Sequence, residues 1–149
     1  MKRKLYRAQV RKGLQGQIQE AFRSVVPQLR TLIENEQLTA VSAHCLDDFI
    51  FIYYECTGVE IEPERMFEGV IPQLLPWPGM PEERFFILMP DIFHYNQPVS
   101  REHWERSRFD PETVPWVRIS YIKPEKLSSY IFYHYQFQEE KPGEGDKYG

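Results

Sequence analysis

The segment that decides the fold reads Phe49-Ile-Phe-Ile-Tyr-Tyr-Glu-Cys56. Phenylalanine, isoleucine and tyrosine are enriched in β-strands, and the Thr57-Gly58 that follows is typical of the end of a strand. From residue 49 to residue 54 both faces of this strand are apolar, and such a strand needs cover on each side. The segment therefore predicts a sheet that is packed on both faces, one of them against another sheet.

The neighbouring segments supply the other strands of that sheet. Residues 38–45 have the composition of a strand, and the Leu46-Asp47-Asp48 that follows is typical of a hairpin turn. Residues 5–10 are predicted to form the first strand of the chain. Residues 91–95 are the candidate fourth strand, after a shorter extended stretch at residues 85–88.

Two helices are predicted to pack on the sheet. The first covers about residues 15–36, where apolar side chains recur at helical spacing. Pro27 falls inside this segment and should kink the helix or begin its second part. The second helix opens at Pro63 and covers roughly residues 64–75. The side chains expected to be buried against the sheet are Phe22, Val26, Leu29 and Ile33.

In chain order these elements are β-α-β-β-α-β, the ferredoxin-like arrangement of an α+β protein. The complete unit covers residues 1–96, and residues 97–115 form a polar linker. Residues 116–149 begin a second, partial unit of the same kind, with a strand at residues 116–122, a helix at residues 124–140 and a tail. Either the chain continues beyond Gly149 or a partner subunit supplies the missing elements. We expect two sheets to pair as in a dimeric α+β barrel, most simply in a homodimer.

The composition excludes several classes of protein. The 149 residues are 42% hydrophobic and carry a net charge of only −4, so a core can be buried. No basic stripe alternates with aromatic residues, as it would on a nucleic-acid surface. No segment is long enough to span a membrane, and the basic start at Lys2-Arg3-Lys4 lacks the apolar run of a signal peptide. We therefore expect a cytoplasmic protein without a nucleic-acid or membrane partner, with Cys45 and Cys56 reduced and buried on neighbouring strands.

The candidate site lies on the last predicted helix. Tyr130 and His134 are four residues apart, so both side chains lie on one helix face. A phenol beside an imidazole can act as an acid/base pair, because imidazole exchanges protons near neutrality. The alternative is that this face is a packing stripe, since apolar residues follow the same helical spacing. That stripe would consist of Leu127, Tyr130, Ile131, His134, Phe137 and Gln138.

Other side chains could complete a small-molecule site. Tyr133 is near the pair in sequence, and His94 and Tyr95 end the candidate fourth strand, where they could line a cavity. The four histidines are scattered without the close spacing of metal ligands. The glycines at the end of the chain do not form a phosphate loop, because no strand precedes them. We therefore expect no metal and no cofactor.

Three short segments resemble the L-rhamnose mutarotase family, whose fold is a dimeric α+β barrel. They are Ala8-Gln-Val10, Val26-Pro-Gln-Leu29 and Asp91-Ile-Phe-His94, all within the first 96 residues. In that family a tyrosine and a histidine, four apart on the first helix, contribute to the sugar site. The corresponding positions are Ile18 and Phe22 in the first unit, and Tyr130 and His134 in the second.

The resemblance implies a sugar mutarotase, an isomerase that interconverts anomers by moving protons. His134 would exchange the proton with Tyr130 as its partner, and Tyr133, His94 and Tyr95 would contact the sugar or polyol. Two alternatives stay open. A non-catalytic member would keep the barrel as a binding or assembly module, and a monooxygenase, cofactor-free or haem-using, would also fit this superfamily.

Overall fold

The computed structural model describes residues 2–79, 83–90 and 117–140, and of residues 135–140 the backbone alone. The chain divides into two compact units, Met1–Pro90 and Asp91–Gly149. The strand expected at residues 91–95, the linker at 97–115 and the tail after residue 140 lie outside the described residues. The two units are taken in turn.

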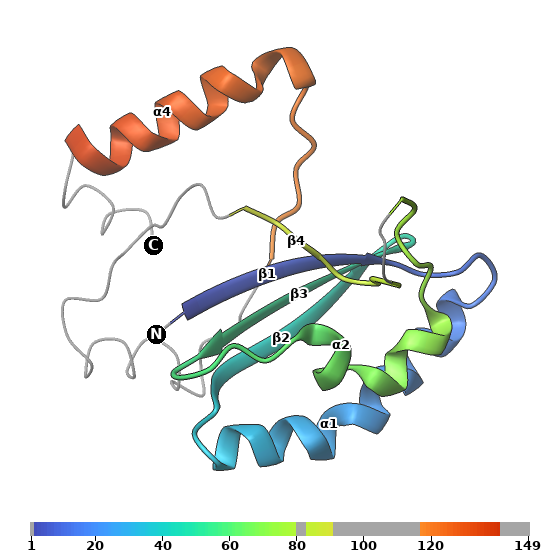
Figure 1. The fold of residues 1–149 in the computed structure, drawn as a ribbon. Helices are drawn as coiled ribbons and strands as arrows, with labels where there is room; N and C mark the ends of the chain where they lie inside the picture. Colours follow the sequence, from blue (N-terminus) through green and yellow to red (C-terminus); the bar gives the residue numbers. More distant parts are fainter. Residues whose placement is uncertain (1, 80–82, 91–116, 141–149) are drawn as a thin grey trace. The chain divides into compact units, whose positions relative to one another are not determined.

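The first unit is a four-stranded antiparallel sheet with its helices on one face (Figure 1). The strands are β1 (Lys2–Gln9), β2 (Leu38–Leu46), β3 (Phe49–Cys56) and β4 (Ile87–Leu88), in the order β2-β3-β1-β4. The α+β class is confirmed, and the sheet is consistent with a ferredoxin-like fold. The described fourth strand, β4, lies in the extended stretch before residue 90.

A two-residue turn joins β2 to β3, as the sequence predicted. Leu46 pairs with Phe49, so Asp47 and Asp48 alone form the turn. Asp47 has a φ of 52°, in the left-handed region that aspartate tolerates better than most residues. The local chemistry of the two aspartates therefore fixes the register of the hairpin.

The helices differ more from expectation. After a 3-10 turn, η1 (Gln15–Gln17), helix α1 (Ile18–Glu34) runs through Pro27 as one element. The predicted second helix is wrong in form, since it divides into α2 (Pro63–Met66) and the 3-10 segment η2 (Glu68–Gln73). The break has a local cause, because Gly69 and Pro72 both disfavour an α-helix interior.

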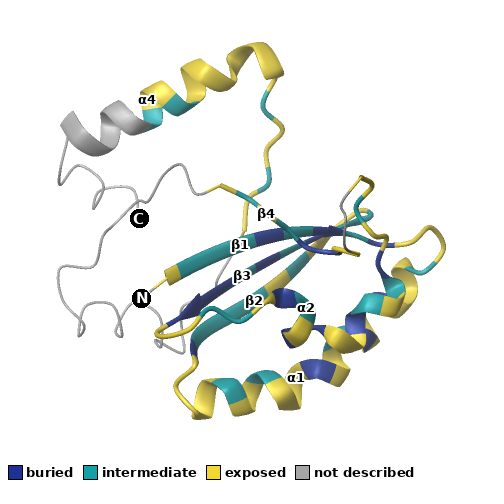
Figure 2. Cartoon of the chain, in the orientation of Figure 1, coloured by how far each residue is buried: buried dark blue, intermediate teal, exposed yellow. Residues whose placement is uncertain are grey.

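The core lies between the sheet and these helices (Figure 2). Ile50, Ile52 and Tyr54 project from β3 into it and are fully buried, and the Tyr6 ring stacks parallel to Tyr54 with centroids 5.9 Å apart. From the helical side, Phe67 meets Phe86 at 5.9 Å. Burial of large side chains of this kind is the main stabilising term, roughly 1.5–3 kcal/mol for each one.

The face that α1 turns to the core is not the one predicted. Ile18, Ala21 and Val25 are buried, whereas Val26 is 41% exposed and Ile33 is 42% exposed. The predicted core set is therefore wrong for Val26 and Ile33, and right only in part for Phe22 and Leu29, which pack against the core while partly exposed. The physical reason is that β2 is the edge of the sheet in the part of the chain that the structure describes, so no described strand lies beyond it to cover this side of α1.

The opposite face of the sheet is aromatic and charged. Phe49, Phe51 and Tyr53 alternate along β3 and are half-buried. The guanidinium of Arg7 lies 4.8 Å from the ring centroid of Phe49 and 4.9 Å from that of Trp77, which are cation–π distances. Cover of this face by a second sheet stays a prediction.

Glu55 is a buried carboxylate at the end of this aromatic row. Its Oε1 accepts a hydrogen bond from the Tyr53 hydroxyl, and its Oε2 accepts one from the Thr39 hydroxyl at 3.3 Å. Arg3 Nε lies 3.8 Å from Oε1. A charged group is tolerated in the interior when hydrogen bonds and a counter-charge replace its water, as they do here.

The cysteines lie on neighbouring strands as expected, and both are free. Cys56 is buried on β3, but Cys45 on β2 is exposed, so the prediction that both are buried is wrong. The cause is again the edge position of β2, which leaves the last residues of that strand in solvent.

The second unit contains the predicted helix without the predicted strand. A 3-10 turn, η3 (Pro124–Lys126), leads into α4 (Leu127–Glu140). Residues 117–122 are not part of a strand, which contradicts the expectation of a strand at residues 116–122. A strand needs a neighbour for its ladder hydrogen bonds, and β-favouring side chains alone do not supply one.

Gly69 tests the packing of η2 on α1. A Cβ at this position would lie 3.1 Å from Ser24 Oγ and 3.1 Å from Val25 Cγ1. We predict that Gly69→Ala lowers the free energy of unfolding by about 1–2 kcal/mol, because the side chains of Ser24 and of the buried Val25 must move to make room in a packed region. Gly58→Ala is the matched control, since a Cβ there meets nothing within 4 Å. Equal urea midpoints for the two variants would contradict the close contact.

A second prediction concerns acid stability. Lys4 Nζ lies 2.8 Å from Glu60 Oε1, and this hydrogen bond lowers the pKa of the Glu60 carboxyl below its ordinary value of about 4.5. The pair therefore stabilises the fold above about pH 4.5, and the stabilisation is lost as the pH falls through the lowered pKa.

We expect Lys4→Met to lower the free energy of unfolding by about 0.5 kcal/mol at pH ~6 and by nothing at pH ~3. Urea denaturation at the two pH values measures this, with the exposed Lys12→Met as control. A loss of the same size at both pH values would show that the charge of Glu60 is not involved.

Candidate functional site

Tyr130 and His134 are in direct contact on α4. Pro124 at the start of η3 has the fixed φ that suits a first helical turn, and the helix that follows places residues four apart on one face. The two ring centroids are 4.0 Å apart with an angle of 34° between the ring planes. The structure therefore brings together the two residues that the sequence paired.

A hydrogen bond fixes the orientation of the imidazole. His134 Nδ1 lies 2.8 Å from the backbone carbonyl oxygen of Tyr130. A carbonyl oxygen only accepts, so Nδ1 must donate and carries the proton. In the neutral ring the second nitrogen, Nε2, is then the basic atom. This arrangement suits a proton acceptor whose position is set by the helix backbone.

The pair lies at the surface of α4 as far as the structure describes it. Tyr130 is 39% exposed, Leu127 on the same face is also exposed, and His134 is half-buried. The face is therefore not a fully buried core stripe within the described residues. A ligand can reach the two rings without unfolding the helix.

The other expected site residues are not shown in contact with Tyr130 or His134, and two of them lie outside the described residues. Tyr133 is exposed, and its ring meets Phe132 edge-on at 5.6 Å. His94 and Tyr95 lie outside the described residues, and their role stays a prediction. In the first unit, Ile18 is buried and Phe22 meets Phe67 edge-on at 5.8 Å, so neither position offers a group that transfers protons.

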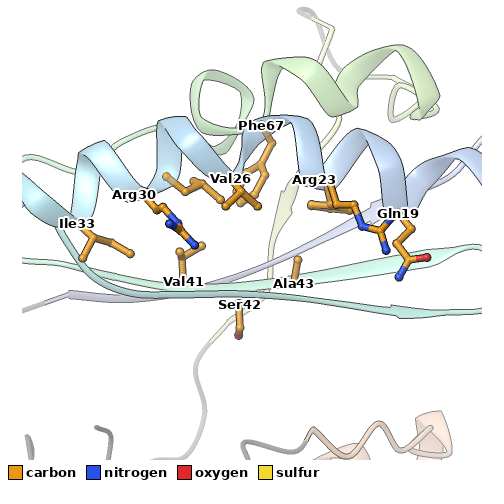
Figure 3. Close-up of a pocket in the computed structure, with 11 residues that line it drawn as sticks. Gln19, Arg23, Val26, Arg30, Ile33, Val41, Ser42, Ala43 and Phe67 are labelled. Carbon is orange, nitrogen blue, oxygen red and sulfur yellow. The ribbon is translucent and has the colours of Figure 1, made fainter. Parts of the chain in front are cut away.

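A groove between α1 and β2 is a second candidate, and sequence reasoning missed it (Figure 3). Its volume is about 410 Å³. Val41 and Ala43 point from β2 toward the helix, whereas Ser42 points away from it (Figure 3). The lining residues are Gln19, Phe22, Arg23, Val26, Leu29, Arg30, Ile33, Val41, Ser42, Ala43 and Phe67.

The groove is apolar at its base and basic at its edge. Its apolar side chains come from α1, from β2 and from the fully buried Phe67 beneath them. Arg23 and Arg30 reach from α1 toward β2, one on each side of Val26 (Figure 3). Among the described residues, no acidic side chain lines it. The sequence feature that could have indicated this groove is the broad apolar stripe on the first helix. A stripe of this width is not fully covered where the helix lies over the edge of the sheet.

Among the described residues, no group of three or more His, Cys, Asp or Glu side chains could hold a metal ion. Within the same residues, no helix has the length and apolar character needed to cross a membrane.

No family model matches the sequence, and no curated protein matches it. Among solved structures, the chain is similar to an L-rhamnose mutarotase from Formosa agariphila, with a TM-score of 0.48 and 14% sequence identity. The similarity covers 64% of this chain and 100% of that chain. The chemistry of this protein must therefore be argued from its own side chains.

The tautomer of His134 is directly testable. We predict that the neutral imidazole carries its proton on Nδ1, because the Tyr130 carbonyl accepts from that atom at 2.8 Å. Long-range ¹H–¹⁵N NMR of the protein at a pH where the ring is neutral distinguishes the two tautomers. Tyr130→Ala is the control, since it keeps the backbone carbonyl and should keep the tautomer. A proton on Nε2 would contradict the assignment of the base.

Proposed function

We propose that this is a mutarotase-like protein, in which Tyr130 and His134 exchange protons with a sugar or a similar polyol. The observation that carries the proposal is the contact between the two rings, together with the hydrogen bond that leaves Nε2 as the basic atom of a neutral His134. The spacing of the pair, which resembles that of the mutarotase family, supports a sugar as the ligand.

The chemistry needs only proton transfer. Opening of a sugar ring removes a proton from the anomeric hydroxyl and delivers one to the ring oxygen, and closure reverses both steps. Nε2 of His134 can take the first proton and return it, while the Tyr130 hydroxyl donates a hydrogen bond or relays the second proton. The aromatic rings of Tyr130 and Tyr133 can pack against the apolar face of the sugar.

The proposal assigns the chemistry to the second unit. Ile18 and Phe22, at the corresponding positions of the first unit, are part of its packing and carry no exchangeable proton. His94 and Tyr95 are proposed as further contacts to the ligand. The proposed acid/base role therefore depends on α4, and on a ligand or partner that covers the face of this helix that carries Tyr130 and His134.

A homodimer belongs to the same proposal. Phe49, Phe51 and Tyr53 form an aromatic row on the sheet face that turns away from α1 and α2, and all three are half-buried. Such a row supports packing against a second sheet, because an apolar sheet face needs cover. Pairing of two such faces would give the expected barrel.

Binding without turnover is the second candidate. Tyr130 is 39% exposed, and an acid/base pair in open solvent gains little from its surroundings. In this alternative the same rings hold a polyol by stacking and hydrogen bonds, and the protein acts as a binding or assembly module.

Anomer exchange measured by saturation-transfer NMR separates the two candidates. With a panel of deoxysugars, we expect the protein to accelerate exchange and His134→Gln to reduce the acceleration by about 100-fold or more, which is the usual contribution of a general acid or base. Tyr130→Phe should retain binding and lose part of the rate. His44→Gln, on β2 of the first unit, is the matched control and should behave as wild type.

Circular dichroism should show unchanged helix content in all three variants, since the substituted side chains are not fully buried. Exchange at the buffer rate in wild type, with sugar binding that His134→Gln weakens, would reject the enzyme and leave the binding module. Exchange that persists in His134→Gln would reject His134 as the base.

A further inference from the structure

We propose that the groove between α1 and β2 binds an amphipathic carboxylate, with its hydrocarbon chain on the apolar base and its charge at Arg23 or Arg30. The groove belongs wholly to the first unit, so this inference is independent of the Tyr130–His134 pair. It assigns a binding site to side chains that the sequence pattern had placed in the core.

The apolar part of the site is already assembled. Val26 and Ile33 of α1 face Val41 and Ala43 of β2 (Figure 3). Phe22 and Leu29 of α1 also line the groove. Phe67 closes the bottom and is fully buried. A volume of about 410 Å³ is within the usual range for small-molecule sites, which are mostly apolar with a few polar groups.

The two arginines at the edge of the groove favour a ligand with a negative charge. Arg23 and Arg30 are seven residues apart on α1, which is about 10 Å along the helix axis at 1.5 Å per residue. A guanidinium binds a carboxylate through two parallel hydrogen bonds. No acidic residue is among the described residues that line the groove, so the one described carboxylate that competes for these guanidinium groups is Glu20 at its edge.

The one ion pair at the edge is weak. Arg23 Nη1 lies 3.3 Å from Glu20 Oε2, and both side chains are exposed. Exposed pairs of this kind contribute little and exchange readily. Arg23 can therefore turn from Glu20 to a ligand at small cost.

Charge also argues against a second copy of this chain as the occupant. A twofold contact through this groove would bring Arg23 and Arg30 of one copy close to the same residues of the other. Like charges brought together in this way repel, and among the described residues only the exposed Glu20 at the edge of the groove could offset them in part. An organic anion meets the same two residues with the opposite sign.

The test uses decanoate, kept below its micelle concentration, and decanol as its uncharged analogue. NMR titration of the whole chain with ¹³C-labelled methyl groups should show saturable shifts at Val26, Ile33 and Val41. The double variant Arg23→Gln/Arg30→Gln should weaken decanoate binding about tenfold or more and leave decanol binding unchanged. Arg84→Gln, an exposed arginine outside the groove, is the matched control and should bind as wild type.

A variant that fills the groove provides the second arm. Ala43 is exposed on β2, so Ala43→Phe should fold, which its melting temperature checks, and should remove binding of both probes. Equal affinity for decanoate and decanol in every variant would overturn the proposal. So would a dimer, seen by sedimentation, that Ala43→Phe dissociates, because a second copy would then be the occupant.

Discussion

The packing of η2 against α1 at Gly69 constrains how the first helix sits on the sheet. A Cβ at this position would lie 3.1 Å from Ser24 Oγ and 3.1 Å from Val25 Cγ1, so the 3-10 segment approaches the helix closely here. Val25 lies in the core at 4% exposure, whereas the next residue, Val26, is 41% exposed. The close approach of η2, which carries Gly69 and Pro72, goes together with this position of α1.

The position of α1 accounts for which of its apolar side chains are buried and which are exposed. Ile18, Ala21 and Val25 are part of the buried core, and the rest of the apolar stripe lies beside β2, which is the edge strand of the sheet among the described residues. An apolar surface left beside two arginines is costly to expose and is typical of a binding site. The groove and the core are therefore two consequences of one helix position, whereas the contact between Tyr130 and His134 on α4 depends on helical spacing alone.

Local rules predicted the elements that depend on local chemistry. The bounds of β3 at Phe49 and Cys56, the two-aspartate turn before it and the contact of Tyr130 with His134 all follow from neighbours in the sequence. Features that depend on distant partners were missed. Residues 117–122 have strand composition but no place in a ladder, and Val26 and Ile33 have core spacing but lie where the sheet ends. A hydrophobic pattern shows that a helix has an apolar side, and only the packing shows how much of that side is covered.

Labelling of single cysteines at residues 25 and 26 tests the position of α1 most directly. In a Cys45→Ser background, which removes the exposed thiol, Val26→Cys should react rapidly with an uncharged maleimide and Val25→Cys should react only as fast as the protein opens. The account predicts a difference of at least about tenfold between the two rates under native conditions. Equal protection at both positions would contradict it, because the whole stripe would then be core and no groove would lie between α1 and β2.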